Sequence, residues 1–378
     1  MRALTCDVLV VGAGPAGASA ARAACGAGAS VIVAERRAEV GLPVRCAEYI
    51  PAMLVGWADV GKDYIAQATV GMRSYLGGSL IQDLTAPGYV IHRDKFDQAL
   101  VCAAKDTGAQ VLTGWQAVAF KEGERSGVCR EHDPEYVASA HDSARQVESV
   151  MLVGKEGEYL RVEARVVIGA DGPHSRVARR VGLANTHALP SLQVRLPLLK
   201  EMSHTHIYFD EDITAGYAWL FPKGKVANVG LGMLRRPRAP GLRQTLRRVV
   251  RQLSLLGLVK EEPLSSTGGW IPAGPPRPCV AGNCMLVGDA AGHTHPITGG
   301  GIFQAVMGGQ MAGRWAARAV KEDRVAVLRE YEREWNELYG DVLAHAYNRR
   351  QDWESHEGVL ESAIRRFWIG FREYYAAP

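Results

Sequence analysis

The chain begins with an apolar run that leads directly into a glycine-rich turn. Residues 8–11 (Val-Leu-Val-Val) precede the pattern Gly12-x-Gly14-x-x-Gly17, an Ala-rich segment follows, and a second apolar run, residues 31–34, ends at Glu35. Short apolar runs bounded by glycine predict buried strands, and the segment between them predicts a helix that packs closely on a sheet. The order of strand, glycine turn, helix, strand and acid is typical of a unit that holds the pyrophosphate of a dinucleotide.

Each residue type in this turn suits that chemistry. Gly12 allows the tight turn, Gly14 lets the backbone approach a phosphate, and Gly17 lets the helix pack on the strand. The first N–H groups of the helix point at the phosphates. Glu35 is placed to accept hydrogen bonds from the ribose hydroxyls of adenosine. The neighbouring positions that we include in the expected cofactor site are Pro15, Ala16 and Arg36.

Two later apolar runs also end at an acid beside a glycine. They end at Asp171-Gly172 and at Gly288-Asp289. A triple glycine, residues 299–301, then opens a long helix predicted for residues 298–322. Ligands of open α/β sheets bind at the carboxyl ends of the strands, so three such ends indicate a large dinucleotide. Backbone N–H groups at the triple glycine would stabilise the anionic ring of a reduced flavin, which favours FAD. Any one of these acids alone is more simply a turn or helix cap.

The pattern changes between residues 192 and 234, where alternation and aromatic residues predict an antiparallel sheet. Tyr217, Trp219 and Phe221 alternate on one predicted strand and would form a flat apolar wall on one face. The alternative is that they are ordinary residues of the sheet core. Residues 121–148 are polar and aperiodic, which predicts an exposed excursion of a hairpin.

Basic and aromatic residues toward the C-terminus allow two interpretations. Residues 242–258 form a predicted basic amphipathic helix, preceded by Arg235, Arg236 and Arg238. We interpret these as a solvated face, the alternative being contact with anionic lipid phosphates. The helical segment from residue 324 ends in aromatic residues that would cover a core or rest at a membrane interface. Of these two interpretations we prefer the core.

These patterns predict an α/β (α+β) fold with three parts. The first is a discontinuous, Rossmann-like FAD-binding domain at residues 1–70, 90–188 and 268–318. The second is an inserted antiparallel β-sheet domain for substrate at residues 71–89 and 189–267. The third is a helical C-terminal region at residues 319–378.

Composition excludes several classes of function. The 378 residues carry a mild net charge of +4 and no basic stripe interleaved with aromatic residues, which argues against nucleic-acid binding. No apolar run reaches the roughly 18 residues of a membrane span, and the first strand begins too early for a signal peptide. Seven irregularly spaced cysteines indicate reduced thiols and a cytoplasmic protein.

Two histidine pairs lack the further ligand that a metal site needs. These are His204 with His206 and His293 with His295, and we expect no metal at either. The second pair follows the Gly288-Asp289 motif directly, so we expect it near the flavin.

The motifs together resemble a known superfamily. Residues 10–17 with Glu35, then residues 170–172, then residues 286–292, are similar to the three FAD-binding signatures of glutathione-reductase-like flavoproteins related to p-hydroxybenzoate hydroxylase. Arg93 falls where that superfamily often has an arginine near the flavin.

Within that superfamily the chain resembles the geranylgeranyl reductase family. The segments that carry this likeness are residues 43–48 (Pro-Val-Arg-Cys-Ala-Glu), residues 217–223 (Tyr-Ala-Trp-Leu-Phe-Pro-Lys) and Pro296 to Ile302. The family signature P-x-x-Y-x-W-x-F-P has Thr214 in place of its first proline here.

The resemblance implies FAD-dependent hydrogenation of carbon–carbon double bonds in a prenyl chain. It places Arg45, Cys46 and Ala47 near the flavin ring, with Pro296, Gly299, Gly300, Gly301 and Ile302 on the loop before the long helix. The catalytic candidates are Cys46, Tyr217 and Trp219, with Cys46 either donating a proton or shaping the pocket. A buried, inert thiol is the alternative for Cys46.

Three other functions stay open on the sequence. They are a flavin monooxygenase or a halogenase of the same fold, acting on an apolar or aromatic substrate, and a non-catalytic flavoprotein that carries a prenyl lipid. No second glycine fingerprint for NAD(P)H follows, so electrons would come from NAD(P)H bound transiently or from reduced ferredoxin. The expected partners are a prenyl lipid or other apolar small molecule, a redox protein and, peripherally, a membrane surface.

Overall fold

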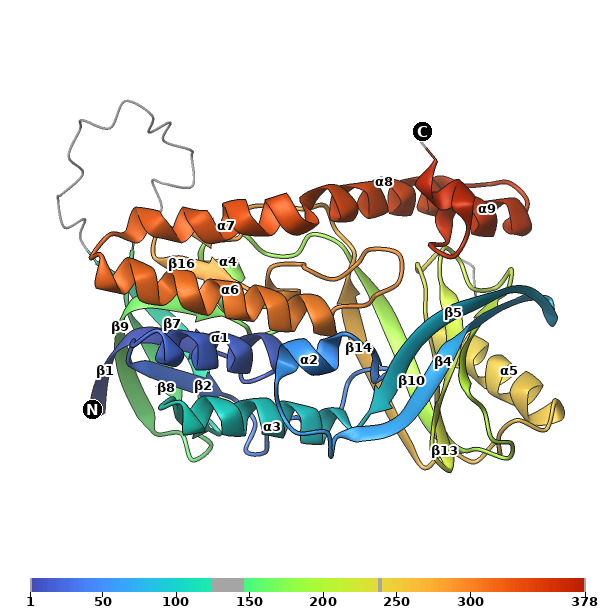
Figure 1. Cartoon of the computed structure of the whole chain (residues 1–378), viewed down its shortest axis with the longest axis horizontal. Coiled ribbons are helices and arrows are strands. Elements are labelled where there is room, and N and C mark those ends of the chain that lie inside the picture. The colour runs from blue at the N-terminus through green and yellow to red at the C-terminus, as the bar shows by residue number, and fades with distance from the viewer. Residues whose placement is uncertain (1, 124–145, 237–239, 377–378) are drawn as a thin grey trace.

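The computed structural model describes residues 2–123, 146–236 and 240–376, and these residues form two large sheets with helices around them (Figure 1). Residues 124–145, which hold most of the predicted polar excursion, and Arg238 of the predicted basic face lie outside the described part.

The first sheet is built around the N-terminal strand. Its described strands run in the order β15-β16-β9-β1-β2-β6, and β8 pairs with both β9 and β7. β1 pairs in parallel with β2 and with β9, and its residues Val8 to Val11 are buried. These strands are β1 (Arg2–Val11), β2 (Val31–Glu35), β6 (Gln110–Thr113), β7 (Gln116–Glu122), β8 (Val147–Val153), β9 (Tyr159–Gly169), β15 (Val280–Ala281) and β16 (Cys284–Leu286). The predicted strand–helix–strand unit is therefore confirmed.

Glycine and alanine set how closely the helices of this part pack. The helices are α1 (Pro15–Gly26), α2 (Leu54–Ala58), α3 (Arg93–Asp106), α4 (Arg176–Arg180) and α6 (Ile302–Lys321), with the 3₁₀ helix η1 (Gly288–Ala290). A Cβ atom at Gly309 of α6 would lie 2.2 Å from the Ala16 oxygen, and one at Gly313 would lie 2.2 Å from the Ala20 oxygen. Only glycine permits this approach of α6 to α1.

The second sheet contains the aromatic strand. Its described strands run in the order β14-β10-β13-β12-β11-β4-β5-β3. They are β3 (Tyr49–Pro51), β4 (Ile65–Leu76), β5 (Ser79–Ile91), β10 (Ala188–Pro197), β11 (His204–Phe209), β12 (Tyr217–Lys223), β13 (Val226–Gly232) and β14 (Ser265–Pro272). The neighbouring pairs are antiparallel, as predicted for residues 192–234, except that β11 and β4 are parallel.

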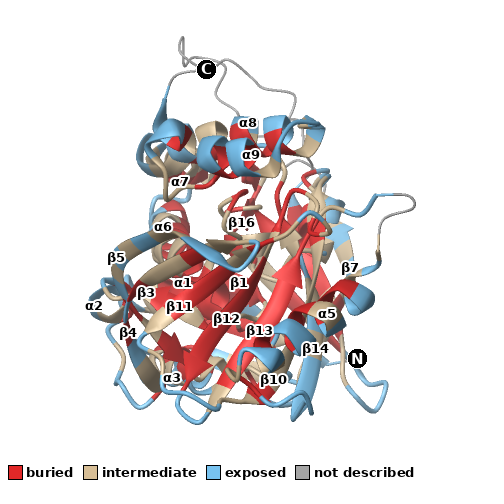
Figure 2. Cartoon of the chain, turned by 90° about the vertical axis from the view of Figure 1, so that its right-hand side faces the viewer, coloured by how far each residue is buried: buried red, intermediate tan, exposed pale blue. Residues whose placement is uncertain are grey.

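Helices cover both faces of the second sheet (Figure 2). Helix α5 (Leu242–Leu255) packs its apolar side on one face, where Leu246, Val249 and Leu253 meet Ala218 and Leu220. The predicted basic amphipathic helix is thus a core-covering helix. The opposite face carries Trp219 and Phe221 and packs against the C-terminal helices.

The C-terminal region runs along one side of the molecule and reaches both sheets (Figure 1). It consists of η2 (Val325–Leu328), α7 (Arg329–Trp335), the π-helical η3 (Asn336–Gly340), α8 (Asp341–Ser355), α9 (Leu360–Phe367) and η4 (Arg372–Tyr375). Phe367, Trp368 and Tyr374 are buried against the second sheet. The aromatic end of the chain therefore covers a core, as we preferred on the sequence.

The limits of the three domains remain a proposal. The strands of the second sheet that precede residue 100 lie at residues 49–51, 65–76 and 79–91, so the chain enters this sheet before returning to the first. Among the described helices, none is both long and apolar enough to cross a bilayer.

Candidate functional site

The glycine turn after β1 has one open position and two crowded ones. Gly12 has φ +105°, and a Cβ atom there would lie 2.3 Å from the Ala170 oxygen. A Cβ atom at Gly17 would lie 1.9 Å from the Gly12 oxygen, whereas one at Gly14 would meet nothing within 4 Å. The turn thus exposes bare backbone at Gly14, next to the N-terminus of α1. This geometry fits the pyrophosphate of a dinucleotide.

Glu35 lies beside this turn. Its Oε2 accepts a hydrogen bond from the Ala13 N–H at 2.9 Å, and its Oε1 accepts one from the Arg37 N–H at 2.9 Å. A carboxylate offers about four lone-pair sites, so capacity remains for ribose hydroxyls. Arg36 is exposed at the end of β2. The structure therefore fits the adenosine end of FAD at Glu35.

The three strands that end at acids lie close together in the first sheet: β16 is next to β9, and β1 lies between β9 and β2. Gly169 of β9 pairs with Val11 on one side and with Leu286 on the other. Asp171 accepts hydrogen bonds from the Ser175 hydroxyl and the Arg176 N–H, so its carboxylate orders the start of α4. This is the capping role that we set against cofactor binding on the sequence. Gly172 beside it has φ +83° and open space at its Cβ position.

Asp289 follows the third strand end. Its Oδ1 accepts a hydrogen bond from the Thr294 hydroxyl at 2.8 Å, and burial raises the pKa of its carboxyl. The hydrogen bond from Thr294 and the positive charge of Arg93 oppose this rise in pKa. Gly288 turns the chain here with φ +58°.

The loop from Pro296 to Gly301 is held by the C-terminal region. The buried guanidinium of Arg350 on α8 donates from Nε to the Pro296 oxygen at 2.9 Å, and its two terminal nitrogens donate to the Ile297 and Ala215 oxygens. The Tyr217 hydroxyl donates to the Thr298 oxygen. Gly299 and Gly300 follow, and Gly301 directly precedes Ile302, the first residue of α6. Burial lowers the pKa of Arg350 to about 10, so it stays charged at neutral pH.

The two histidine pairs have local partners. His293 stacks on Trp335 at 3.6 Å between ring centroids, and burial lowers its pKa to about 3, so it is neutral. His295 accepts at Nδ1 from the Ile297 N–H at 3.3 Å. His206 shares a hydrogen bond with Tyr208 at 3.0 Å. Within the residues that the structure describes, no three His, Cys, Asp or Glu side chains form a metal-binding group.

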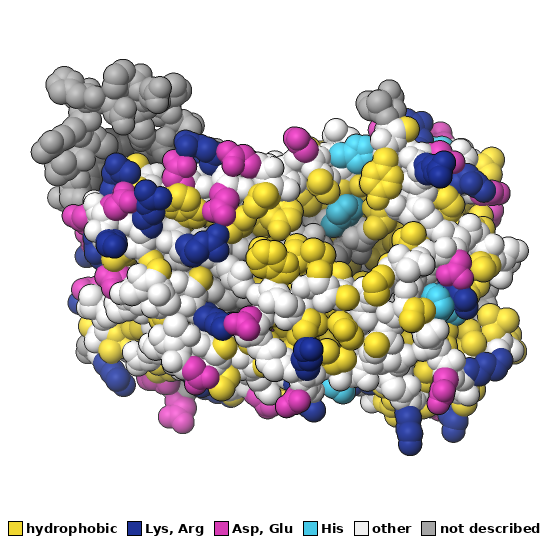
Figure 3. All heavy atoms as spheres, in the orientation of Figure 1, with side chains coloured by type: hydrophobic (Ala, Val, Ile, Leu, Met, Phe, Trp, Pro, Cys, Tyr) yellow, Lys and Arg dark blue, Asp and Glu magenta, His cyan; other side chains and the backbone are white. Residues whose placement is uncertain are grey.

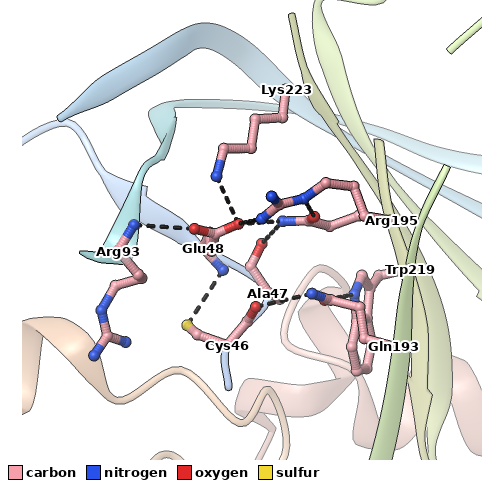
Figure 4. A network of polar contacts seen from close by, with 9 residues as sticks. Cys46, Ala47, Glu48, Arg93, Gln193, Arg195, Trp219 and Lys223 are labelled. Carbon is pink, nitrogen blue, oxygen red and sulfur yellow. Dashed lines mark hydrogen bonds and ion pairs between the residues drawn. The ribbon is translucent and has the colours of Figure 1, made fainter. Parts of the chain in front are cut away.

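A buried carboxylate ties the loop at Cys46 to the second sheet (Figure 4). Glu48 is fully buried, and its Oε2 accepts from Lys223 Nζ at 2.7 Å, Asn228 Nδ2 at 2.8 Å and Arg195 Nη2 at 3.0 Å. These partners come from β10, β12 and β13. The charge of Lys223 holds the pKa of Glu48 below its ordinary value, against the effect of burial.

Glu48 also fixes the start of α3. Its Oε1 accepts a hydrogen bond from the Arg93 N–H at 2.9 Å. The helix begins at Arg93, and Asp94 lies inside its first turn, not at its N-cap. The acceptor at this N-terminus comes instead from a loop that is 45 residues away in sequence. The Arg93 guanidinium forms two hydrogen bonds to Asp97, each 2.9 Å long.

Cys46 is held by hydrogen bonds to its sulfur and to its backbone oxygen. Its Sγ accepts a hydrogen bond from the Glu48 N–H at 3.2 Å, and its backbone oxygen accepts one from Gln193 Nε2 at 3.0 Å. Burial raises the pKa of the Cys46 thiol, and the Arg93 guanidinium opposes part of the rise. Arg45 beside it is exposed, and the Ala47 backbone oxygen accepts a hydrogen bond from Asn228 Nδ2 at 3.1 Å.

The predicted aromatic wall lies on one face of β12. The ring centroids of Tyr217 and Trp219 are 6.0 Å apart, and those of Trp219 and Phe221 are 6.4 Å apart. Tyr49 extends the row beside Phe221, at 5.9 Å, and Trp368 extends it beside Tyr217, at 5.0 Å. Trp219 donates from Nε1 to the Gln193 amide oxygen at 2.9 Å. Gln193 therefore joins the wall to the Cys46 loop.

Sequence reasoning missed the polar residues that connect these parts. Glu48 and Lys223 stand in the motifs that we quoted, but we gave them no role. Gln193 and Arg195 alternate on β10, and Asn228 stands opposite Arg195 in the register of β13. Polar side chains at alternate, core-facing positions of a strand are a usable signal, because buried polar groups need partners.

One face of the molecule is hollowed (Figure 3). The hollow lies below the C-terminal helices in that view, and apolar side chains gather to its left. Helix α2 lies at the front of the molecule in Figure 1. Trp57 of α2 is 51% exposed, and Met53, which precedes it, is 61% exposed.

Sequence models of three families match the chain. They are a geranylgeranyl reductase catalytic domain at residues 191–265, an FAD binding domain at residues 116–211 and an NAD(P)-binding Rossmann-like domain at residues 10–77.

Curated relatives match over most of their length. Digeranylgeranylglycerophospholipid reductase 1 of Methanopyrus kandleri is 36% identical over 353 residues, which cover 89% of this chain and 88% of the relative. Digeranylgeranylglycerophospholipid reductase of Methanothrix thermoacetophila is 34% identical over 364 residues, which cover 90% of this chain and 85% of the relative.

Solved structures match the fold. A geranylgeranyl bacteriochlorophyll reductase-like protein from Thermoplasma acidophilum superposes with a TM-score of 0.79 at 27% identity, over 97% of both chains. The flavin-dependent brominase Bmp2 superposes with a TM-score of 0.69 at 15% identity, over 97% of this chain and 89% of that chain. At that identity the likeness to the brominase shows the fold alone.

Proposed function

This chain belongs to the geranylgeranyl reductase family of FAD-dependent oxidoreductases, and from that premise we propose that it hydrogenates carbon–carbon double bonds of geranylgeranyl-type chains. The names of the relatives favour a glycerophospholipid that carries such chains as the substrate. The site residues and their roles below are part of this proposal.

One observation carries the proposal. The loop at Cys46 and the aromatic face of β12 are joined by the Gln193 amide, which contacts the Cys46 oxygen at 3.0 Å and the Trp219 nitrogen at 2.9 Å. The loop that carries the Cys46 thiol is thus joined to the strand face that carries a row of aromatic rings. An extended prenyl chain suits such a row, because both are apolar and the prenyl chain has no hydrogen-bonding groups to satisfy.

The chemistry divides between the cofactor and the chain. When bound and reduced, FAD supplies the hydride. Cys46 holds a proton at Sγ, because burial raises the pKa of its thiol above the ordinary value. One carbon of the double bond receives the hydride, and the other carbon takes the proton from the Cys46 thiol. The S–H bond breaks as this C–H bond forms, and the thiolate left on Cys46 regains a proton from water. Arg93 stabilises that thiolate through its positive charge.

The aromatic residues orient the chain and exclude water. Tyr217, Trp219 and Phe221 give the prenyl chain one apolar side made of tilted rings, and the Tyr217 hydroxyl donates to the Thr298 oxygen. Burial raises the pKa of Tyr217 above its ordinary value, so it remains an uncharged hydrogen-bond donor. Trp368 of the C-terminal region packs against Tyr217, and Phe209 of β11 packs against Trp368. Exclusion of water protects a reduced cofactor from side reactions.

The source of electrons and the cellular setting belong to the same proposal. We propose NAD(P)H or reduced ferredoxin as the donor, because the sequence has one glycine fingerprint, at Gly12 to Gly17. We propose a cytoplasmic protein that contacts membranes peripherally through the exposed Met53 and Trp57. Exposed apolar side chains that gather in a patch are typical of surfaces that contact a membrane or another protein.

A reoxidation assay tests the proposal. Protein loaded with FAD is reduced with dithionite without oxygen and mixed with a geranylgeranyl glycerophospholipid in detergent. The visible absorbance of oxidised FAD should return with the lipid and stay absent with its fully saturated counterpart. Equal rates with both lipids would exclude alkene reduction. Oxygen consumption with a hydroxylated lipid would indicate a monooxygenase instead.

A further inference from the structure

We propose that Glu48 is a positioning residue that fixes Cys46 relative to the aromatic wall. The inference rests on the proposed function for its catalytic meaning, but the placement of Cys46 can be measured without turnover.

The contacts of the Cys46–Glu48 segment come from both sides. The second sheet supplies Gln193 to the Cys46 oxygen, Asn228 to the Ala47 oxygen, and three donors to Glu48 Oε2. The first part of the chain supplies the Arg93 N–H to Glu48 Oε1. Figure 4 shows the carboxylate of Glu48 between Lys223 and Arg195 on one side and Arg93 on the other. One side chain therefore connects three strands of the second sheet with the first turn of α3.

The backbone at Glu48 is held in an unfavourable conformation. Its φ is +72°, in the left-handed region that non-glycine residues rarely adopt. This conformation directs the Glu48 N–H to the Cys46 sulfur at 3.2 Å. A strained residue persists only where surrounding contacts determine it. The four donors to its carboxylate are those contacts, so the strain and the sulfur contact depend on the charge of Glu48.

The charges explain why glutamate stands here. Lys223 is buried, with 3% of its side chain exposed, and Arg195 is partly exposed. Without Glu48, Lys223 would be a buried cation without an ion-pair partner, a situation that is strongly destabilising. Loss of the Glu48 charge is therefore expected to weaken the contacts that hold residues 46–48 at Glu48. The hydrogen bond from the Glu48 N–H to the Cys46 sulfur would then be lost more easily.

Thiol labelling of the FAD-loaded protein tests the inference. The rate at which N-ethylmaleimide modifies Cys46 is measured by peptide mass spectrometry, with the exposed Cys102 as an internal reference. Glu48→Gln keeps the size of the side chain and removes its charge. We expect Cys46 in this variant to react at least about tenfold faster, because the local opening that exposes it becomes easier. The exposed Glu39, changed to Gln, is the matched control and should leave the rate unchanged.

Two further measurements separate positioning from a purely structural role. Gln193→Met removes the hydrogen bonds to the Cys46 oxygen and to Trp219 Nε1 without changing any charge, and its labelling rate carries the same test if Glu48→Gln does not fold. In alkene reduction, kcat of Glu48→Gln should fall with KM nearly unchanged, because the proton donor moves while the aromatic wall keeps its contacts. An unchanged labelling rate of Cys46 in both folded, FAD-loaded variants would overturn the inference. Faster labelling in a protein that reduces no lipid would support it and reject the proposed function alone.

Discussion

Single atoms decide whether the glycine turn can hold a dinucleotide. A Cβ atom at Gly17 would overlap the Gly12 oxygen at 1.9 Å, whereas a Cβ atom at Gly26 would meet only a methyl group of Thr107 at 3.8 Å. Both glycines belong to α1, and one lies at the cofactor end of the helix and the other at its far end. They therefore form a matched pair of positions.

Gly17→Ala should weaken FAD binding by at least about tenfold, because the turn and the first helical N–H groups must shift away from the phosphates. Gly26→Ala should bind FAD as the wild type does. Titration of apoprotein with FAD, followed by flavin fluorescence, gives both dissociation constants. Equal affinity in the two variants would show that the turn does not hold the cofactor.

The pH dependence of turnover reports on Cys46. Burial raises the pKa of its thiol, so the donor is protonated at neutral pH and loses its proton only as pH rises through that elevated value. Activity should therefore have an alkaline limb at a pH above the ordinary cysteine pKa of about 8.5. Cys46→Ala should lower kcat about tenfold or more and lack this limb, as measured by kcat against pH. A limb that persists in Cys46→Ala would assign it to another group.

The sequence predicted residues whose role is local and missed those that act over long distances. Glu35 and the glycines follow from spacing within 30 residues, because strand, turn and helix form a continuous unit. Glu48 finds its cationic partners at Arg195 and Lys223, more than 140 residues away, and Arg350 finds Ala215 at a similar separation. No spacing rule in one sequence links such positions. Only the packing of the two sheets and α8 brings them together.

At the scale of elements, the C-terminal helix α8 supports the loop before α6. Arg350 satisfies three backbone oxygens with one guanidinium, at Ala215, Pro296 and Ile297. Ala215 itself has φ +43°, so its conformation also depends on this support. The loop and the start of the aromatic strand are thus held by a helix from the far end of the chain.

Arg350→Lys should destabilise the protein by about 1–3 kcal/mol, because an ammonium cannot serve three separate oxygens and leaves a buried acceptor unpaired. Arg366→Lys is the matched control on α9, where the side chain is 55% exposed and its pairing with Asp352 is loose. That change should stay within about 0.5 kcal/mol. Urea unfolding followed by tryptophan fluorescence measures both free energies. Equal effects would show that Arg350 does not anchor the loop.

The pattern of elements was predictable where periodicity is local. Alternation over residues 192–234 predicted antiparallel strands, and the basic helix was recognised from its apolar spacing. The parallel pairing of β11 with β4 was not predictable, because it joins strands separated by more than 120 residues. The acceptor at the start of α3 was not predictable for the same reason, since it is Glu48, 45 residues away in sequence.

At the scale of the whole molecule, Glu48 connects the second sheet to the start of α3, and we expect the stability that this connection provides to depend on pH. Lys223 holds the pKa of Glu48 in the folded protein below its value in the unfolded chain. The contribution of Glu48 to stability is therefore present at neutral pH and is lost as pH falls through the folded pKa. The stability difference between wild type and Glu48→Gln should therefore be greatest near neutral pH and shrink in acid. Urea unfolding at a series of pH values measures it. A difference that stays constant with pH would contradict a charged Glu48.

The function proposed for the molecule predicts a defined change in its substrate. Protein loaded with FAD, reduced without oxygen and incubated with a geranylgeranyl glycerophospholipid, is analysed by mass spectrometry of the extracted lipid. The account predicts products that gain two hydrogen atoms for each double bond reduced, and a lower yield with Cys46→Ala. A lipid recovered unchanged in mass, from protein whose FAD is fully reduced, would contradict it.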